Sequence, residues 1–548
     1  MRSILIALLA LCSAVATLAQ PVIKTGGIVN GASWSLAGEL NSNIAQGSIF
    51  IICGSGLGPK TLVSATTFPL PTSKGLDGVT VSIATYPKAT NAILLWVRDD
   101  YIAAVLPSTV PVGRNQLTVA YEGQTSQPES FTVTPSSIGI LSQSSNGSGP
   151  GLITDATKTF ANNDIRTILV TPTNSAKPGD TLVLWATGVG PVKWDESNTP
   201  PADPTNLQKT VSPVVYIGDQ VVTPTFAGRS GCCAGMDQIQ FKIPANVVTG
   251  CQVPIAVMVG DTVSNFVSAA IDPSGEACSD EFGFSSEDIT AMASESESYG
   301  FASFLTQRTF GATSVGPLNY NQELTQFVKL GASSTGEVQS PRPSLSTCMV
   351  TQNVKYPSYL DPFTYGGTGL DAGPTVFVSW PPASGAFVAQ STTAPGEYPA
   401  QITETSGPPA TYKFQGSGGK DVGPFVVTVP TNAVSHFTLG QRTGGARGSE
   451  PGGLTIYWTG GDPEGFVEIT AYNAQSNSIG APGIGFTCEA PTAQGHFYIP
   501  KAVTDGMFDG LTYFAITAWS APVSFKAQGI DKGLAMFGWQ IQANDAIF

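Results

Sequence analysis

Two stretches decide the fold of this chain: Ala45–Pro59, AQGSIFIICGSGLGP, and Lys177–Pro191, KPGDTLVLWATGVGP. They align without a gap, 132 positions apart, and each contains an apolar run that ends in Gly-x-Gly-Pro. A second pair, Asp100–Pro107 (DYIAAVLP) and Asp237–Pro244 (DQIQFKIP), lies 137 positions apart. Only five residues are therefore inserted between the two landmarks. Two patterns that keep register in this way indicate one module present twice.

Each copy contains short strand-like runs separated by turn residues, with no helical period. In the first copy the predicted strands are Ser48–Cys53, Val79–Ile83, Tyr101–Leu106, Gln116–Tyr121 and Glu129–Val133. A module of roughly 110–135 residues with this pattern is typical of an immunoglobulin-like (Ig-like) β-sandwich. We predict the first copy at residues 20–135 and the second at residues 136–278.

The glycines of Gly54-Ser55-Gly56-Leu57-Gly58 follow a strand and have the spacing of a nucleotide-phosphate loop. Such a loop must open a helix whose N-terminus faces the phosphate. Here Pro59 and a Thr/Pro-rich stretch follow, and the second copy has Ala186 in place of the first glycine. The glycines therefore predict a turn between strands, and we expect no cofactor.

Several elements together, GSGLGP/ATGVGP, DQIQFKIP, GCCAG, VSNFVSAAI and the closing CSD, resemble a family of secreted acidobacterial (Solibacter-type) proteins. That family carries tandem IPT/TIG-like Ig modules and is functionally uncharacterised. The resemblance covers about residues 25–280. It implies the fold and an extracellular location, and it implies no catalytic residue.

Residues 1–19 have the pattern of a signal peptide, with Arg2, an apolar run from Ile4 to Val15, and cleavage expected before Gln20. The apolar run is too short for a transmembrane helix, and no later segment predicts one. We therefore expect a secreted protein. The formal net charge is −14 with no basic cluster, which argues against nucleic acid as a partner.

Six cysteines are disulfide candidates, since export permits disulfides. Their pairing stays open: Cys232, Cys233, Cys251, Cys278, Cys348 and Cys488. A zinc site is the weaker interpretation, because Cys232 and Cys233 are adjacent and both histidines lie far from them. Cys53, inside an apolar strand, is expected in the core.

Beyond Cys278 we predict a Ser/Glu-rich connector at residues 279–334 with a short helix capped by Ser285 and Asp288. Residues 335–548 predict a further β-sandwich or jelly-roll-like domain. Within it, a hairpin is expected to turn at GGDPEG, residues 460–465, and to pair Thr459 with Phe466. This register buries Trp458 and exposes Tyr457, the candidate ligand contact.

No catalytic motif is present. Asp462 and Glu464, and likewise Asp99 and Asp100, are close in sequence, but turns and strand ends often contain acidic residues. His436 and His496 both lie in strand-like runs, and no Gly-x-Ser-x-Gly elbow accompanies them.

Three classes of function remain after this search. The favoured one is a non-catalytic binding or adhesion protein whose ligand is a glycan or surface polymer. The alternatives are a hydrolase with a catalytic C-terminal domain and a structural envelope protein. Two convergent carboxylates in a cleft of residues 335–548 would favour the hydrolase. An exposed aromatic face would favour binding.

Overall fold

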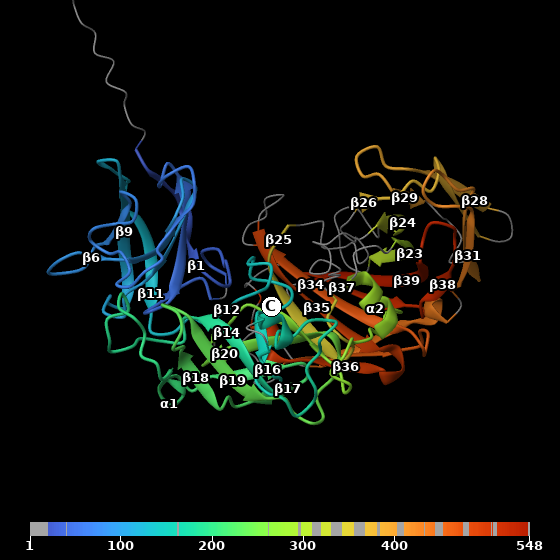
Figure 1. The fold of residues 1–548 in the computed structure, drawn as a ribbon. Coiled ribbons are helices and arrows are strands. Elements are labelled where there is room, and N and C mark those ends of the chain that lie inside the picture. Colours follow the sequence, from blue (N-terminus) through green and yellow to red (C-terminus); the bar gives the residue numbers. More distant parts are fainter. Residues whose placement is uncertain are drawn as a thin grey trace, which may run out of the picture.

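The fold is all-β, as predicted: β-sandwich modules follow one another along the chain. Figure 1 shows the first module in blue, the second in green and the C-terminal domain in yellow to red. The computed structural model describes residues 20–39, 41–161, 164–260, 262–293, 298–309, 319–329, 342–355, 368–380, 384–402, 410–431, 433–443, 453–474, 482–505, 507 and 512–545. Residues 1–19, where the signal peptide is predicted, lie outside this set.

Module one is a sandwich of two sheets. One sheet has the strand order β1 (Val22–Asn30), β3 (Ile49–Ser55), β8 (Tyr101–Val105), β7 (Ile93–Val97), β4 (Val63–Ser64). The other has the order β2 (Ile44–Ala45), β11 (Glu129–Thr134), β9 (Gly113–Tyr121), β5 (Thr80–Ile83), β6 (Thr90–Asn91), with β10 (Gln124–Thr125) beside β9. All five strands predicted in this copy are present.

Module two repeats this architecture. Its first sheet has the order β12 (Gly139–Ile140), β14 (Thr181–Thr187), β19 (Asp237–Lys242), β18 (Phe226–Arg229), β15 (Thr205–Asn206), with β13 (Ile153–Asp155) beside β14. Its second has the order β17 (Gln220–Val222), β16 (Val214–Ile217), β20 (Gly250–Val259), β21 (Thr262–Val263), with β22 (Val267–Ile271) beside β20. Two short helices lie in the connections: η1 (Ile165–Thr167) and α1 (Gln208–Val211).

The duplication extends to strand register and to single hydrogen bonds. In module one β3 pairs with β8 so that Ile49 lies opposite Val105, and in module two β14 pairs with β19 so that Thr181 lies opposite Lys242. These pairs are related by the two sequence offsets, 132 and 137. One residue further on, at an offset of 138, a single hydrogen bond is repeated: the Ser126 hydroxyl accepts from the Val119 amide at 3.0 Å, and the Ser264 hydroxyl accepts from the Val257 amide at 2.9 Å.

The glycine motif is a turn, as predicted. Gly56 and its counterpart Gly188 have φ values of +63° and +93°, a left-handed conformation that favours glycine. No helix follows either of them, because the chain continues into bends and short strands.

A buried ion cluster connects the two modules. Arg229 is fully buried; its Nε lies 2.9 Å from Asp237 and its Nη1 lies 3.2 Å from Glu196. Glu196 also accepts hydrogen bonds from the backbone amide (2.7 Å) and the hydroxyl (3.0 Å) of Ser108, a residue of module one. Beside this cluster, Ala234 of module two packs among apolar side chains of module one that include Ile49. Charge and apolar contacts therefore fix the joint together.

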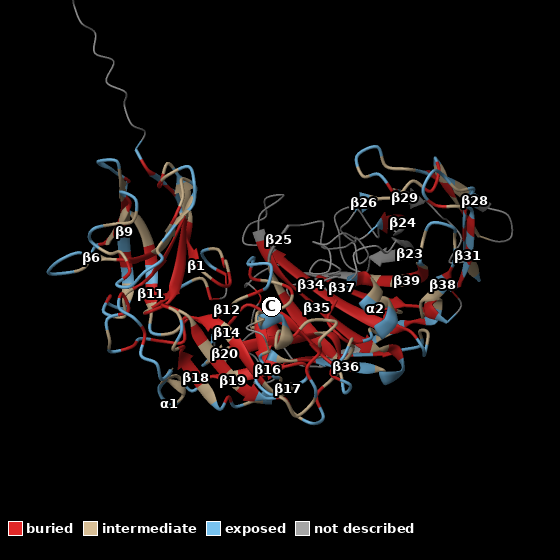
Figure 2. Cartoon of the chain, viewed as in Figure 1, coloured by how far each residue is buried: buried red, intermediate tan, exposed pale blue. Residues whose placement is uncertain are grey.

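The C-terminal domain is a sandwich in which a large sheet faces two smaller ones. The large sheet has the order β25 (Thr347–Lys355), β35 (Pro482–Pro491), β34 (Phe466–Ala474), β37 (Thr512–Trp519), β39 (Lys532–Asp545), β23 (Ser298–Thr309), β24 (Asn319–Lys329), β26 (Thr368–Gly369), with β29 (Glu397–Ile402) beside β24 and β38 (Val523–Phe525) beside β39. Figure 2 shows that its central strands are buried.

Two smaller sheets cover the large one. The β27 sheet has the order β28 (Ser384–Ala389), β27 (Thr375–Trp380), β30 (Thr411–Gly416), β31 (Phe425–Pro430). The β33 sheet has the order β32 (Thr438–Thr443), β33 (Leu454–Thr459), β36 (His496–Ile499). Side chains from all three sheets share one apolar core. Among the described residues, its connections contain the short helices η4 (Val434–His436), η5 (Thr492–Gln494) and α3 (Lys501–Thr504).

The predicted boundary of this domain at residue 335 is wrong. Strands β23 and β24 lie within the predicted connector, yet they belong to the large sheet, and β23 pairs in parallel with β39 near the end of the chain. Sequence texture could not reveal a partner more than 200 positions away. The predicted helix is present as α2 (Ser286–Ala293), and its cap is reciprocal: Asp288 accepts from the Ser285 amide at 2.8 Å, and Ser285 Oγ accepts from the Asp288 amide at 3.2 Å.

The predicted hairpin is also wrong. Strand β33 pairs with β32 and β36, whereas β34 pairs with β35 and β37 in the large sheet. The GGDPEG segment therefore crosses from one sheet to the facing one. The predicted buried side of each strand is confirmed, because Ile456 and Trp458 are buried and so are Val467 and Ile469. The two apolar rows face each other from opposite layers of one core, and they do not lie side by side in one sheet.

Candidate functional site

An exposed aromatic face lies on the β33 sheet. Tyr457 of β33 lies opposite His496 of β36, and Tyr498 follows two residues along the same strand. The side chains of Tyr457 and Tyr498 are 41% and 50% exposed, and His496 is exposed too. Alternation explains the arrangement, since the intervening Phe497 points into the core. We call Tyr457, His496 and Tyr498 the aromatic face.

The rings of this face are held in place by local contacts. The rings of Tyr457 and His496 are stacked, with centroids 5.9 Å apart and planes 22° apart. His496 Nδ1 lies 3.1 Å from the carbonyl oxygen of Gln494, so the ring is held against the backbone of its own strand end. A Cβ on Gly453 would come within 3.0 Å of the Tyr498 ring, so this ring lies close over the backbone.

The sequence singled out Tyr457 and missed its two neighbours. Tyr457 is exposed, as expected, while its role as a ligand contact stays a prediction. Trp458 is buried and donates from Nε1 to the Thr492 carbonyl at 2.8 Å, so it belongs to the core as predicted. His496 and Tyr498 could have been found from the alternation in GHFYIP, which places both on the face opposite to Phe497 and Ile499.

The convergent carboxylates of this domain lie in its interior. Glu468 and Glu489 are directly opposite each other on β34 and β35, and they are 6% and 0% exposed. Arg342 contacts Glu468 at 2.8 Å and Glu489 at 3.8 Å, and its guanidinium lies over the rings of Phe466 and Trp519. Burial raises the pKa of both carboxyl groups, Glu489 most strongly, and Arg342 opposes that shift. These carboxylates do not line a surface cleft.

The acidic pairs noted in the sequence make structural contacts. Asp462 accepts hydrogen bonds from the backbone amides of Glu464 (3.2 Å) and Ala521 (3.0 Å), which fixes the crossing between the two sheets. Asp99 pairs with Lys60 at 2.6 Å, and Asp100 pairs with Arg98 at 2.5 Å, both at the surface of module one. His436 is exposed at the end of η4, and its backbone carbonyl lies against Gly460 of the crossing segment.

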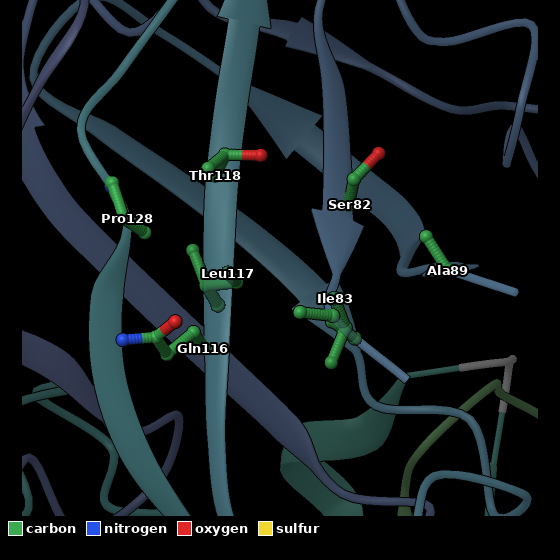
Figure 3. A pocket seen from close by; sticks show the side chains of 8 residues that line it. Ser82, Ile83, Ala89, Gln116, Leu117, Thr118 and Pro128 are labelled. Carbon is green, nitrogen blue, oxygen red and sulfur yellow. The ribbon is translucent and has the colours of Figure 1, made fainter. Parts of the chain in front are cut away.

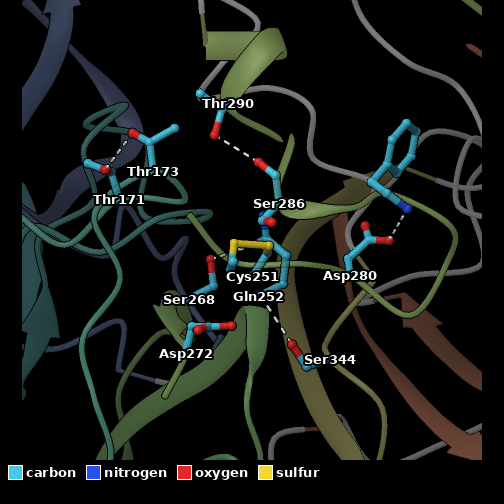
Figure 4. The surroundings of a disulfide bond; sticks show 12 residues. Thr171, Thr173, Cys251, Gln252, Ser268, Asp272, Asp280, Ser286, Thr290 and Ser344 are labelled. Atoms are coloured by element: carbon cyan, nitrogen blue, oxygen red, sulfur yellow. Dashed lines mark hydrogen bonds between the residues drawn. A yellow bond between two sulfur atoms is a disulfide. The ribbon is translucent and has the colours of Figure 1, made fainter. Parts of the chain in front are cut away.

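All six cysteine candidates form disulfides: Cys232–Cys233, Cys251–Cys278 and Cys348–Cys488. Figure 4 shows the second of these beside Gln252 and Ser344. There the backbone amide of Gln252 donates to Ser344 Oγ at 3.2 Å, so the disulfide lies where module two meets the C-terminal domain. Cys53 is a half-buried free thiol whose pKa is raised by burial. Among the described residues, no three His, Cys, Asp or Glu side chains gather as a metal site.

Module one has a small hollow between β5 and β9 (Figure 3). Its volume is about 150 Å³, and its lining includes Ile83, Gln116, Leu117 and Pro128. Pockets for drug-sized ligands measure roughly 300–1,000 Å³. This hollow is therefore a weaker candidate for a binding site than the aromatic face.

Together these features define a multi-module β-sandwich protein with an exposed aromatic face. No protein-family model matches the chain, and no curated protein is significantly similar to it in sequence. The resemblance to acidobacterial IPT/TIG-like proteins therefore stays a prediction. In the part of the chain that is described, no helix is long and apolar enough to cross a membrane.

Solved structures with some similarity include domains 5–6 of the S-layer protein SbsC, with 14% identity over 46% of this chain and 98% of that chain, and a TM-score of 0.15. SGBP-B from a xyloglucan utilization locus of Bacteroides uniformis has 11% identity over 70% of this chain and 86% of that one, with a TM-score of 0.16. SGBP-B of Bacteroides ovatus, in complex with a mixed-linkage heptasaccharide, has 10% identity over 85% and 95%, with a TM-score of 0.14. TM-scores this low carry no functional argument.

Proposed function

We propose that this chain is a secreted, non-catalytic binding protein that holds a glycan on the aromatic face of its C-terminal domain. The observation that carries the proposal is the row of exposed rings, Tyr457, His496 and Tyr498, on one side of the β33 sheet. Sugar rings have apolar C–H faces that pack on flat aromatic rings, while phenol and imidazole groups supply hydrogen bonds to hydroxyls.

Further features support an extracellular location and a spacer role for the Ig-like modules. Three disulfides suit an oxidising compartment, and residues 1–19 have the signal-peptide pattern. The ion cluster at Arg229 links the modules through buried contacts, so they would act as one stiff arm.

The test measures binding of the full secreted chain to soluble neutral polysaccharides (a mixed-linkage β-glucan, a xylan, a galactomannan and a dextran) by affinity gel electrophoresis. We expect one of these to retard the protein. Tyr457→Ala and Tyr498→Ala should each weaken that binding about ten-fold, the loss expected for a stacked ring worth roughly 1.4 kcal/mol.

The matched control is Tyr86→Ala. Tyr86 is 96% exposed but lies on module one, so its removal should leave binding unchanged. Binding that is equally strong without Tyr457 and Tyr498 would contradict the proposal. Release of new reducing ends from any of the polysaccharides would instead favour a hydrolase.

A further inference from the structure

A second exposed surface lies on the β27 sheet. Four outward side chains stand opposite one another across its four strands, in the order Phe387, Phe377, Gln415, Val426. Strands lie about 4.8 Å apart, so this row is roughly 14 Å long, the length of a few sugar rings. The next row contains Ser379, Lys413 and Thr428.

The two phenylalanines form a platform of two rings whose planes are tilted by 40° to each other. Their ring centroids are 4.6 Å apart, and Phe387 is 74% exposed although its neighbour Val388 is buried. A Cβ on Gly385 would come within 2.5 Å of Phe377 Cζ, so the Phe377 ring lies over this glycine. A larger residue at position 385 would displace the ring.

Packing alone explains only part of this surface. An aromatic ring over a strand glycine stabilises a sheet, which accounts for Phe377. It does not account for Phe387, whose ring is mostly in water. Nor does it account for Lys413 and Gln415, which are exposed and make no ion pair or side-chain hydrogen bond within the described part of the chain.

The charge of the surface points to the kind of partner. The four strands contain no Asp or Glu, and Lys413 is their one charged residue, in a chain whose net charge is −14. A local cation beside a ring platform complements a polymer that has both apolar sugar faces and carboxylate groups.

We propose that the outer face of the β27 sheet binds an acidic polysaccharide, with its sugar rings on Phe377 and Phe387, its hydroxyls on Gln415 and a carboxylate on Lys413. This site extends the proposed binding function and uses none of the residues of the aromatic face.

The test measures binding of the full chain to polygalacturonate by affinity gel electrophoresis, at low and at high salt. Phe387→Ala should weaken binding about five- to ten-fold. Lys413→Gln should weaken it roughly two- to five-fold at low salt, and this difference should vanish at high salt, because exposed ion pairs are modest and screened. Gly385→Val should also weaken binding by displacing the platform.

The controls separate this proposal from the previous one. Tyr457→Ala should leave polygalacturonate binding unchanged, and Phe387→Ala should leave neutral-glycan binding to the aromatic face unchanged. Because Phe387 and Lys413 are exposed, their variants should fold normally, which circular dichroism checks. The proposal is overturned if the chain does not bind polygalacturonate, or if Phe387→Ala and Lys413→Gln bind it as strongly as the unmodified chain.

Discussion

Removal of the Arg229 cation should destabilise module two and loosen its joint with module one. Arg229 is the cation between Glu196 and Asp237, and all three side chains are at most 2% exposed. Arg229→Met keeps much of the side-chain volume but leaves two carboxylates without their shared cation. Breaking a buried ion pair from one side costs about 3–5 kcal/mol, and we expect the upper part of this range because one arginine serves two acids.

The assay is thermal unfolding of the full chain at pH 7, followed by calorimetry. For a module of this size, each kcal/mol lowers the melting temperature by roughly 2–4 °C, so the first transition should fall by about 10 °C or more. Limited proteolysis should then cut between the modules, because Glu196 no longer holds Ser108 in a fixed place.

The duplication provides a matched control. Asp100 of module one occupies the position of Asp237, but it pairs with Arg98 at the surface. Arg98→Met should therefore leave the melting temperature unchanged. Combining Arg229→Met with Glu196→Gln and Asp237→Asn should recover much of the lost stability, since no unpaired charge remains buried. Equal, small effects of the Arg229 and Arg98 variants would refute this reasoning.

Three further predictions concern the C-terminal domain. Replacing Cys348 and Cys488 by alanine opens a loop of 140 residues and should lower the free energy of unfolding by about 5 kcal/mol, measured in guanidinium. Tyr398→Phe removes a buried hydroxyl that donates to Gly373 (2.7 Å) and accepts from Ala372 (3.1 Å), and should cost about 1–3 kcal/mol in the same assay. Burial raises the pKa of folded Glu489, so the folded state binds its proton more tightly; the associated stability is present in acid and is lost as pH rises above about 4. Glu489→Gln should therefore make the fall in melting temperature between pH 5 and pH 8 shallower.

The repeat was fully readable from the sequence because it compares the chain with itself. The offsets of 132 and 137 relate the strand registers of the two modules. Gly56 and Gly188 both adopt a left-handed conformation at the equivalent turn. The pairing of the cysteines was not readable in this way. Cys348 and Cys488 meet because β25 pairs with β35, which no local pattern states.

Local alternation states which face of a strand is buried, but not which strand is its neighbour. For β33 and β34, an alternating pair joined by a glycine turn fits a hairpin and a crossing between facing sheets equally well. The choice between these two arrangements depends on strands that lie elsewhere in the sequence. In the structure β36 lies beside β33, and β35 lies beside β34. Strand β36 also brings His496 and Tyr498 next to Tyr457. The error in the fold and the incompleteness of the predicted site thus have one cause.

The two copies of the module also show how a duplicated position can gain a new role. Asp100 comes directly before β8 and Asp237 is the first residue of β19, yet one is at the surface with Arg98 and the other is buried with Arg229. Asp237 has its contacts inside module two, with Arg229 and the Val189 amide, whereas Glu196 of the same cluster reaches Ser108 across the joint. If the modules serve as a stiff arm for the C-terminal domain, the joint affects binding only by setting the position of that domain. Arg229→Met should then weaken attachment to an immobilised polymer less than Tyr457→Ala does, even though it destabilises the protein more.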